Sequence, residues 1–216
     1  MGKRASIVVI AAHSDDQILG PGGTLIKYAR EGKTVYAIIF SFGELSHPWI
    51  KPIHITKKRI LESKKADKII GGKGVFFLGL KEGKFEEEFV QKRMDKKLAV
   101  LLQKLKPEMI FTHASDDPLP DHRAVHRLVL TMYDSIRLAC PVYTFDVWTF
   151  LNFKDSRHPK LVVDITKTFK TKIKALAVFK SQKMAMLSLL WSVYVRAITN
   201  GFKHNKKLAE VFYKVR

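Results

Sequence analysis

The sequence predicts an α/β fold, a mostly parallel β-sheet with helices on both faces. Short β-rich apolar segments alternate along the chain with segments of 10 to 20 residues whose apolar positions recur at helical intervals. Such alternation forms βαβ units, whose right-handed crossovers place successive strands in parallel. The first apolar segment, 6–12, is almost free of polar residues, as expected for a strand that is buried on both faces.

The other elements are predicted in chain order from the same periodicities and from the glycines and prolines at their ends. Further strands are predicted over 35–41, 75–78, 109–112, 141–150 and 160–163. The strand over 109–112 comes shortly after Pro107. Helical spacing predicts helices, the second of them ended by three glycines, over 18–30, 55–70, about 89–104, 121–137, 165–180 and 184–200. Residues 81–88 are predicted to form a charged loop, and Asp164 is expected to cap the helix after it.

Length and composition favour one domain over residues 1–216. The chain is 46% hydrophobic and 27% charged, and we find no repeat or linker that would divide it. The single cysteine, Cys140, excludes an intramolecular disulfide and any site built from several thiolates, so a metal would need His, Asp or Glu. The first apolar run is too short for a signal sequence, and the longest, 184–198, is shorter than a bilayer span. We therefore expect a cytoplasmic protein without a transmembrane helix.

The charge balance is strongly basic. Lys and Arg number 39 against 20 Asp and Glu, which gives a formal charge of +19. A field of that sign attracts anions such as phosphate esters, nucleic acid or anionic lipid head groups. The sequence holds no recognisable nucleic-acid motif, so we expect no specific nucleic-acid partner, and solvated helix faces account for most of the lysines.

Two polar clusters follow the first and fourth predicted strands, at the sheet edge where ligands bind in such folds. His13, Asp15 and Asp16 leave the first strand together, and a divalent cation would compensate the adjacent carboxylates. The second cluster, 112–122, ends in His122. Two histidines and one carboxylate, with a fourth position open to water, are the ligands of a catalytic zinc. The alternative is that these side chains cap helices or pack as neutral rings.

A glycine-rich stretch, 20–24, invites comparison with a dinucleotide-binding loop. The Gly-x-Gly-x-x-Gly frame from Gly20 ends in Leu25, and the two acids ahead of it would repel a pyrophosphate. We therefore interpret these glycines as close-packing positions where a helix meets the sheet.

Taken together, the motifs resemble a known family, the LmbE/PIG-L zinc-dependent N-acetylglucosaminide deacetylases. That family carries an Ala-His-Pro-Asp-Asp-Glu motif and a later His-Pro-Asp-His motif on a Rossmann-like sheet. The matching segments here are Ala12-His13-Ser14-Asp15-Asp16-Gln17, Leu19-Gly20-x-Gly22-Gly23-Thr24 and Pro120-Asp121-His122. Further similarity lies at Gly43-Glu44, Arg59-x-x-Glu62, Phe77-Leu78-Gly79-Leu80 and Ser181-Gln182. The resemblance implies a single-domain, Rossmann-like three-layer sandwich.

The resemblance also implies roles for individual residues. One Zn²⁺ per subunit would be held by His13, Asp16 and His122. Asp15 would be the general base that takes a proton from the attacking water and returns it to the departing amine. Asp121 would orient an imidazole. The reaction would release acetate and a free amino sugar.

Three positions depart from the family pattern. Ser14 and Gln17 replace Pro and Glu, and neither change removes a ligand. Leu119 stands where the family's first histidine of the second motif helps to stabilise the developing oxyanion, and leucine cannot donate a hydrogen bond. We expect His113 to substitute, while His126 is the other available imidazole and could instead be a rival metal ligand.

Glu44, Trp49 and Arg59 are expected to contact the substrate, a small amino sugar whose phosphorylated or lipid-linked forms would suit the basic chain. Trp49 could equally pack on its own loop, and Arg59 could pair with Glu62. The alternative function is a catalytically impaired family member that binds nucleic acid or phospholipid head groups. For the apolar final helix we prefer packing in the core or in a homo-oligomer to contact with a membrane surface.

Overall fold

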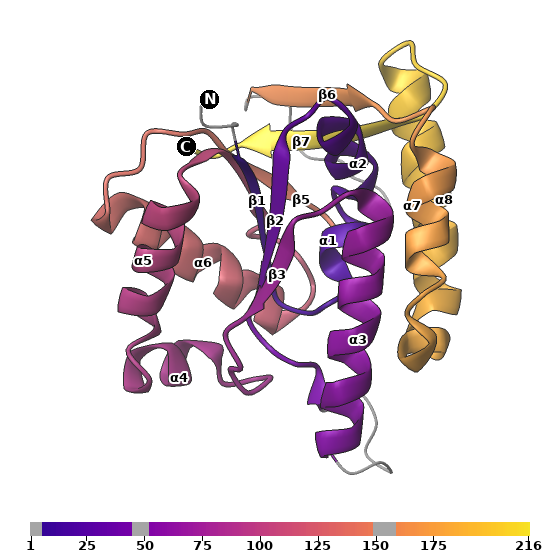
Figure 1. Cartoon of the computed structure of the whole chain (residues 1–216). Helices are drawn as coiled ribbons and strands as arrows, with labels where there is room; N and C mark the ends of the chain where they lie inside the picture. The colour runs from indigo at the N-terminus through magenta and orange to yellow at the C-terminus, as the bar shows by residue number, and fades with distance from the viewer. Residues whose placement is uncertain (1–5, 45–51, 149–158) are drawn as a thin grey trace.

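The computed structural model describes residues 6–44, 52–148 and 159–216, and these form a sheet flanked by helices (Figure 1). The strands are β1 (Ser6–Ala11), β2 (Thr34–Ile39), β3 (Gly74–Phe77), β4 (Pro107–His113), β5 (Val142–Phe145), β6 (Lys160–Asp164) and β7 (Ala209–Lys214). Their order is β3-β2-β1-β4-β5-β7-β6. The first five are parallel, and β7 runs antiparallel to both β5 and β6. The predicted α/β fold with a mostly parallel sheet is confirmed.

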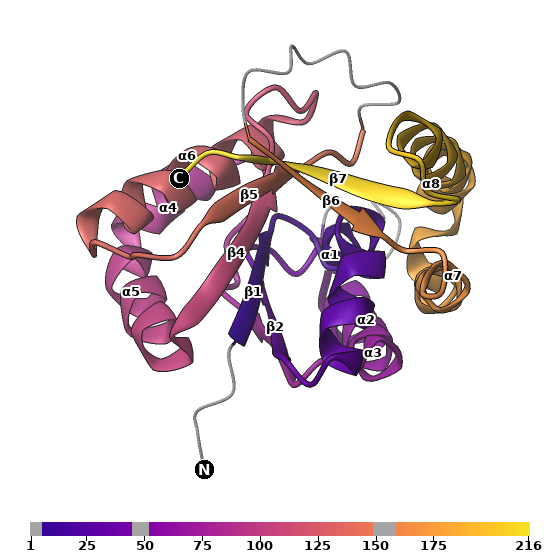
Figure 2. The same ribbon diagram turned by 90° about the horizontal axis from the view of Figure 1, so that it is seen from above.

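Helices cover both faces of the sheet (Figures 1 and 2). They are α1 (Asp16–Leu19), α2 (Gly22–Arg30), α3 (Pro52–Ile70), α4 (Phe85–Gln91), α5 (Met94–Leu105), α6 (Pro120–Ser135), α7 (Phe169–Leu176) and α8 (Lys183–Lys203), with a 3₁₀ turn, η2 (Lys180–Gln182). Every residue of β1 is buried, because successive side chains enter opposite cores. Ile7 and Val9 pack with α2, α3, α7 and α8, and Val8 and Ile10 pack with α4, α5 and α6.

The predicted helix over 18–30 is two helices, because Gly20 and Pro21 interrupt it. The aromatic ring of Phe145 lies against Gly20, so that a Cβ there would come within 2.3 Å of the ring atom Cδ2. A Cβ on Gly23 would meet Cγ2 of Ile165 at 2.8 Å. The interpretation of these glycines as close-packing positions is confirmed.

Two local predictions were wrong, and one strand was not predicted. Asp164 ends β6 and accepts a hydrogen bond from Thr166 N at 2.9 Å, while the following helix begins at Phe169. The predicted loop 81–88 contains the start of α4, whose Phe85 is buried against Phe40. The strand β7 has no counterpart in the prediction. None of the helices within the described ranges has the length and apolar character needed to cross a membrane.

Candidate metal centre and active site

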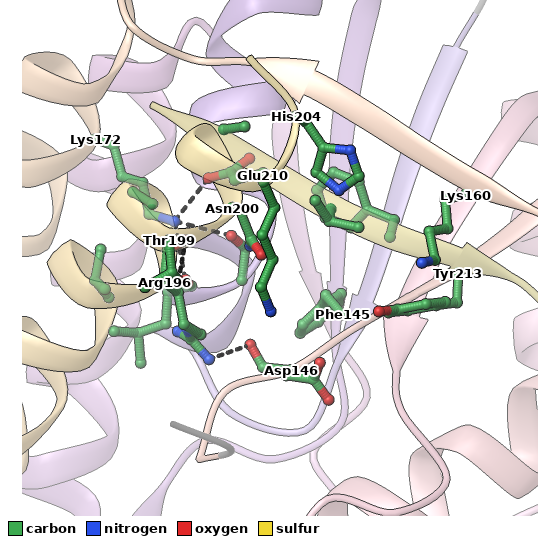
Figure 3. Close-up of a pocket in the computed structure, with 18 residues that line it drawn as sticks. Phe145, Asp146, Lys160, Lys172, Arg196, Thr199, Asn200, His204, Glu210 and Tyr213 are labelled. Atoms are coloured by element: carbon green, nitrogen blue, oxygen red, sulfur yellow. Dashed lines mark hydrogen bonds and ion pairs between the residues drawn. The ribbon is translucent and has the colours of Figure 1, made fainter. Parts of the chain in front are cut away.

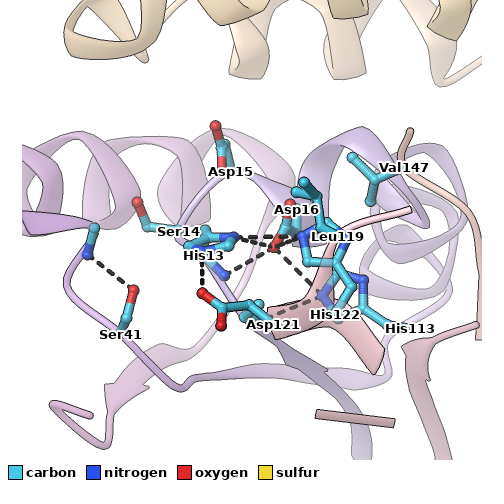
Figure 4. A network of polar contacts seen from close by, with 12 residues as sticks. His13, Ser14, Asp15, Asp16, Ser41, His113, Leu119, Asp121, His122 and Val147 are labelled. Carbon is cyan, nitrogen blue, oxygen red and sulfur yellow. Dashed lines mark hydrogen bonds and ion pairs between the residues drawn. The ribbon is translucent and has the colours of Figure 1, made fainter. Parts of the chain in front are cut away.

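Parallel pairing of β1 with β4 brings the two polar clusters of the sequence to one edge of the sheet (Figure 4). His13 follows β1, and Asp16 opens the short helix α1. His122 lies in the first turn of α6, which begins seven residues after the end of β4. Residues more than 100 positions apart in the chain, such as His13 and His122, therefore meet at the carboxyl ends of adjacent strands.

Three side-chain atoms form a triangle with equal sides. Oδ2 of Asp16 lies 3.4 Å from Nδ1 of His13 and 3.4 Å from Nε2 of His122. The two ring nitrogens are also 3.4 Å apart. Ligands at about 2.1 Å in a tetrahedral zinc site are separated by about 3.4 Å. The donor types and their spacing therefore fit a divalent cation, and the His13, Asp16 and His122 cluster is consistent with a metal site.

Carboxylates around the triangle favour positive charge on its two histidines. Burial disfavours a charged His13, yet Asp121, Asp16 and Glu82 raise its pKa to about 10. Burial likewise opposes the charge on His122, and Asp16 and Asp117 raise its pKa to about 9. Although burial opposes its ionisation, the neighbouring histidines hold the pKa of Asp16 well below its usual value. A cation at this point would be met by carboxylates that are already ionised.

A buried carboxylate that was not predicted from the sequence lies behind His122. Oδ1 of Asp117 lies 2.9 Å from Nδ1 of His122, and Asp117 is fully buried. Its carboxylate accepts hydrogen bonds from the backbone N–H groups of Leu119 at 3.0 Å and Val147 at 3.4 Å. A carboxylate behind a ligating imidazole is the usual arrangement in metal sites. The sequence placed Asp117 in the polar segment, but nothing there distinguished it from Asp116.

Asp121 reaches the other imidazole of the triangle. Its Oδ2 atom lies 3.5 Å from Nε2 of His13, and Oδ1 accepts a hydrogen bond from Gly83 N at 3.0 Å. A second carboxylate, Glu82, lies 3.4 Å from the same ring nitrogen and was not foreseen, because it comes from the loop after β3. Asp121 thus contacts the ring of His13, and its orienting role stays a prediction.

Asp15 lies beside the triangle and pairs with Arg59. Oδ1 of Asp15 is 3.6 Å from Nη2 of Arg59, and both side chains are buried (Figure 4 shows Asp15 above His13 and Asp16). Burial raises the pKa of Asp15 above its usual value, although the charge of Arg59 acts against the shift. A buried carboxyl group with a raised pKa binds a proton more readily than an exposed one, as a general base must.

Arg59 is enclosed beside Asp15 and is only 2% exposed. Its Nε atom donates to Oγ of Ser14 at 3.3 Å, and Nη1 donates to the carbonyl oxygen of Gly43. Gly43 has φ +75°, and a Cβ there would lie 2.3 Å from the guanidinium carbon. Glu62, the predicted helical partner of Arg59, instead accepts hydrogen bonds from the backbone and hydroxyl of Ser181. Arg59 thus holds Asp15 and Ser14 in position through these contacts.

The predictions that Glu44 and Trp49 contact the substrate stay predictions. Glu44 is half-buried after β2, at the end of a described segment. Trp49 lies outside the described residues.

His113 does not occupy the place expected of an oxyanion donor. The ring is fully buried and stacks on His122, with ring centroids 3.8 Å apart. Its Nε2 atom accepts a hydrogen bond from Ala12 N at 3.0 Å and therefore has no proton to offer a substrate. His126 donates from Nδ1 to the carbonyl oxygen of His113 at 2.8 Å, so it supports this ring and lies apart from the triangle.

Two cations from the C-terminal half of the chain, Lys172 and Arg196, bind backbone near the site (Figure 3 shows Lys172 with Glu210 and Arg196 with Asp146). Arg196 of α8 donates to the carbonyl oxygens of Asp146 and Val147 at 2.7 and 2.9 Å, and Val147 N is the donor to Asp117. Lys172 of α7 forms an ion pair with Glu210 at 2.7 Å. It also donates to the carbonyl oxygens of Leu19 and Gly20, at the end of α1. The buried Lys172 and the half-buried Arg196 therefore hold backbone next to α1 and next to Asp117.

Comparison with known proteins agrees with this geometry. A family model described as PIG-L, GlcNAc-PI de-N-acetylase, matches residues 8–133, more than half of the chain. The chain is 27% identical over 191 residues to a probable N-acetyl-alpha-D-glucosaminyl L-malate deacetylase 2 of Bacillus cereus, covering 84% of this chain and 85% of the relative. It is 24% identical over 223 residues to 4-oxalmesaconate hydratase of Pseudomonas putida, covering 94% and 82%.

The fold is also shared with solved structures. The N,N'-diacetylchitobiose deacetylase of Pyrococcus horikoshii superposes with a TM-score of 0.80 at 20% identity, covering 99% of this chain and 84% of that one. At this level of identity the likeness concerns the fold alone.

Proposed function

The chain belongs to the PIG-L/LmbE family of deacetylase-like proteins, and from this premise we propose that it is a metal-dependent amide hydrolase that removes acetyl from an N-acetylglucosamine derivative. The observation that carries the proposal is the equal-sided triangle of His13 Nδ1, Asp16 Oδ2 and His122 Nε2, with the buried carboxyl of Asp15 beside it. Neither half of this arrangement suffices alone, because amide hydrolysis needs both an activated acyl group and a proton carrier.

His13, Asp16 and His122 would hold one Zn²⁺ per subunit. When bound, such an ion polarises the acyl oxygen and makes water acidic enough to react near neutral pH. Asp117 lies against Nδ1 of His122, so that Nε2 is the ring nitrogen that faces Asp16 and His13 and would bind the ion after losing its proton. Asp121 and Glu82 fix the ring of His13 from the other side.

Asp15 carries the proton. Water attacks the acyl carbon as it loses a proton to the Asp15 carboxylate, and the same proton then passes to the amine nitrogen as the C–N bond breaks. Without it the nitrogen would leave as an anion, which is a poor leaving group. Arg59 holds the carboxylate in position and favours its ionised form against burial. The products are acetate and a free amino sugar.

The test combines metal analysis with acetate release. Purified protein is loaded with zinc, and acetate is measured from N-acetylated glucosaminides that include phosphorylated, inositol-linked and malate-linked forms. Asp15→Asn is expected to keep one zinc per chain and to lose about 10² to 10⁴ in turnover. Asp16→Ala is expected to lose the metal as well, and Asp116→Asn, an exposed neighbour of the site, serves as the control. Full activity of Asp15→Asn would remove Asp15 from the mechanism.

A second candidate is hydration of an unsaturated carboxylic acid, which is favoured by the similarity to 4-oxalmesaconate hydratase over 94% of the chain. In that reaction the water oxygen adds to one carbon of a double bond and a proton adds to the other, so no amine departs. Leu119, which has no group to donate, fits this chemistry as well, and the +19 charge attracts carboxylate substrates. Loss of the ultraviolet absorbance of a conjugated dicarboxylate, without acetate release from any glucosaminide, would select the hydratase.

A further inference from the structure

The outer face of α8 carries a continuous row of exposed apolar side chains. Its members recur every three or four positions and so share one face of the helix. We call it the α8 stripe: Leu187, Trp191, Tyr194, Ile198 and Phe202. Trp191 is 54% exposed and Phe202 is 85% exposed. The opposite face, with Leu189, Val193 and Ala197, is buried in the core, so packing of α8 on the sheet leaves the stripe outside.

The stripe lies in the most one-sidedly charged part of the chain. Residues 165–209 contain nine lysines and one arginine and no aspartate or glutamate. The exposed lysines border the stripe at its ends and along the neighbouring helix α7: Lys167, Lys170, Lys174, Lys180, Lys183, Lys203, Lys206 and Lys207. Helices α7 and α8 form the outermost layer on one side of the molecule (Figures 1 and 2), and Phe169 of α7 packs edge-on against Tyr194.

We propose that the α7–α8 layer docks on an anionic lipid surface. The stripe would enter the head-group region, where tryptophan, tyrosine and phenylalanine are favoured, and the lysines around it would lie against lipid phosphates. The described helices do not include one that could span a bilayer, so the contact is one of lying on the surface. The inference goes beyond the proposed reaction and stands whether or not the protein releases acetate.

Charge decides between lipid and a second copy of the chain. A symmetric dimer through the α8 stripe would bring two faces of identical positive charge together, with no carboxylate in residues 165–209 to pair with the lysines. An anionic bilayer offers negative head groups opposite the lysines and an apolar region for the α8 stripe. Apolar side chains are common singly on protein surfaces, but five in one row are not.

Vesicle flotation tests the proposal with the whole chain. Vesicles of phosphatidylcholine with about one third phosphatidylglycerol are compared with vesicles of phosphatidylcholine alone, at low and at high salt. We expect binding to the anionic vesicles, at least about tenfold weaker binding to the neutral ones, and a steep fall as salt rises.

Paired variants distinguish binding through the α8 stripe from non-specific binding through other exposed apolar residues. The double variant Trp191→Ser with Phe202→Ser is expected to weaken binding roughly tenfold or more, because both side chains are exposed and would be lost from the bilayer. Its control, Val90→Ser with Val100→Ser, removes two exposed apolar residues on α4 and α5 and is expected to bind as the unaltered protein does. Lys170→Glu with Lys174→Glu is expected to weaken binding more than Lys96→Glu with Lys97→Glu on α5.

Three results would overturn the proposal. The first is no binding to anionic vesicles, and the second is equal binding by the stripe variant and its control. The third is a dimer in sedimentation velocity that dissociates in the stripe variant, which would make this face an interface between copies. Circular dichroism and thermal unfolding of each variant establish that it is folded, as expected for substitutions of exposed side chains.

Discussion

Oδ1 of Asp117 lies 2.9 Å from Nδ1 of His122, and neither side chain has any solvent exposure. The contact decides which nitrogen of the ring can bind a cation. Because Asp117 lies against Nδ1, Nε2 is the ring nitrogen that faces Asp16 and His13, and it can bind a cation once it has lost its proton. Asp117 is in turn fixed by backbone N–H groups, so the ring is oriented by the fold itself.

Replacement of Asp117 is therefore expected to weaken metal binding while leaving all three proposed ligands in place. Asp117→Asn should raise the zinc dissociation constant about 10- to 100-fold, because an amide is a weaker acceptor for the Nδ1 proton. Competition with a chromophoric chelator measures the constant. Asp116→Asn, one position away and exposed, is the control and should leave it unchanged. Equal effects of the two substitutions would argue against an orienting role for Asp117.

Leu119 offers a test of gained activity. It is the N-cap residue of α6, directly ahead of the turn that carries His122, and its side chain has no hydrogen-bond donor. Leu119→His should raise deacetylase turnover by about 10², since one donor to a developing oxyanion is worth about that factor. Turnover is measured as initial rates of acetate release.

The matched variant Leu119→Phe supplies a ring of similar size without a donor and is expected to give no increase. If both variants behave alike, or if neither raises turnover, an oxyanion donor is not what position 119 lacks. A rate increase confined to hydration of an unsaturated acid would favour the second candidate function.

Much of the candidate site follows from sequence because its residues sit in short motifs at the ends of predictable strands. His13 and Asp16 are three residues apart, and one strand pairing suffices to bring His122 to them. The contacts of Asp117 and Glu82 could not be predicted from the sequence, because they depend on which loop residue folds back toward an imidazole. The position of His113 was unforeseen for a related reason, since burial behind His122 is a property of the packed sheet edge.

The fold shows the same division between local pattern and distant contact. Buried strands such as β1 were predictable from apolar runs, and α6 from its helical spacing. The strand β7 was missed because Ala209–Lys214 mixes charged and apolar residues and forms only by pairing with β6 and β5. The break between α1 and α2 falls at Gly20-Pro21, a local signal that the predicted helix over 18–30 passed over, whereas the contact of Gly20 with Phe145 could not be read from the sequence.

The ion pair of Lys172 with Glu210 is expected to contribute to stability through burial. Lys172 is 3% exposed and donates to Glu210 and to the carbonyl oxygens of Leu19 and Gly20. Lys172→Met should lower the free energy of unfolding by about 3 kcal/mol, because it leaves the Glu210 carboxylate buried without its cation. Urea denaturation measures the change.

Lys170→Met is the control on the same helix, since its side chain is exposed, and should change stability by less than about 0.5 kcal/mol. Adding Glu210→Gln to Lys172→Met should recover part of the loss, because the stranded charge is then removed. A double variant as unstable as the sum of the two single variants would show that the pair is not coupled.

Asp67 on α3 predicts a pH dependence of stability. The side chain is 8% exposed, and burial raises its pKa from 3.8 to about 6. Between these two values the folded state holds a proton that the unfolded state has released, so this group's contribution to stability is greatest at low pH and falls as pH rises toward 6.

Asp67→Asn removes the titration. The variant should gain on the order of 2 kcal/mol over the unaltered protein at pH 7, and the gain should vanish near pH 4. Urea denaturation across this range measures the difference, with the exposed Glu31→Gln as the control. A difference that stays constant with pH would mean that Asp67 titrates alike in both states.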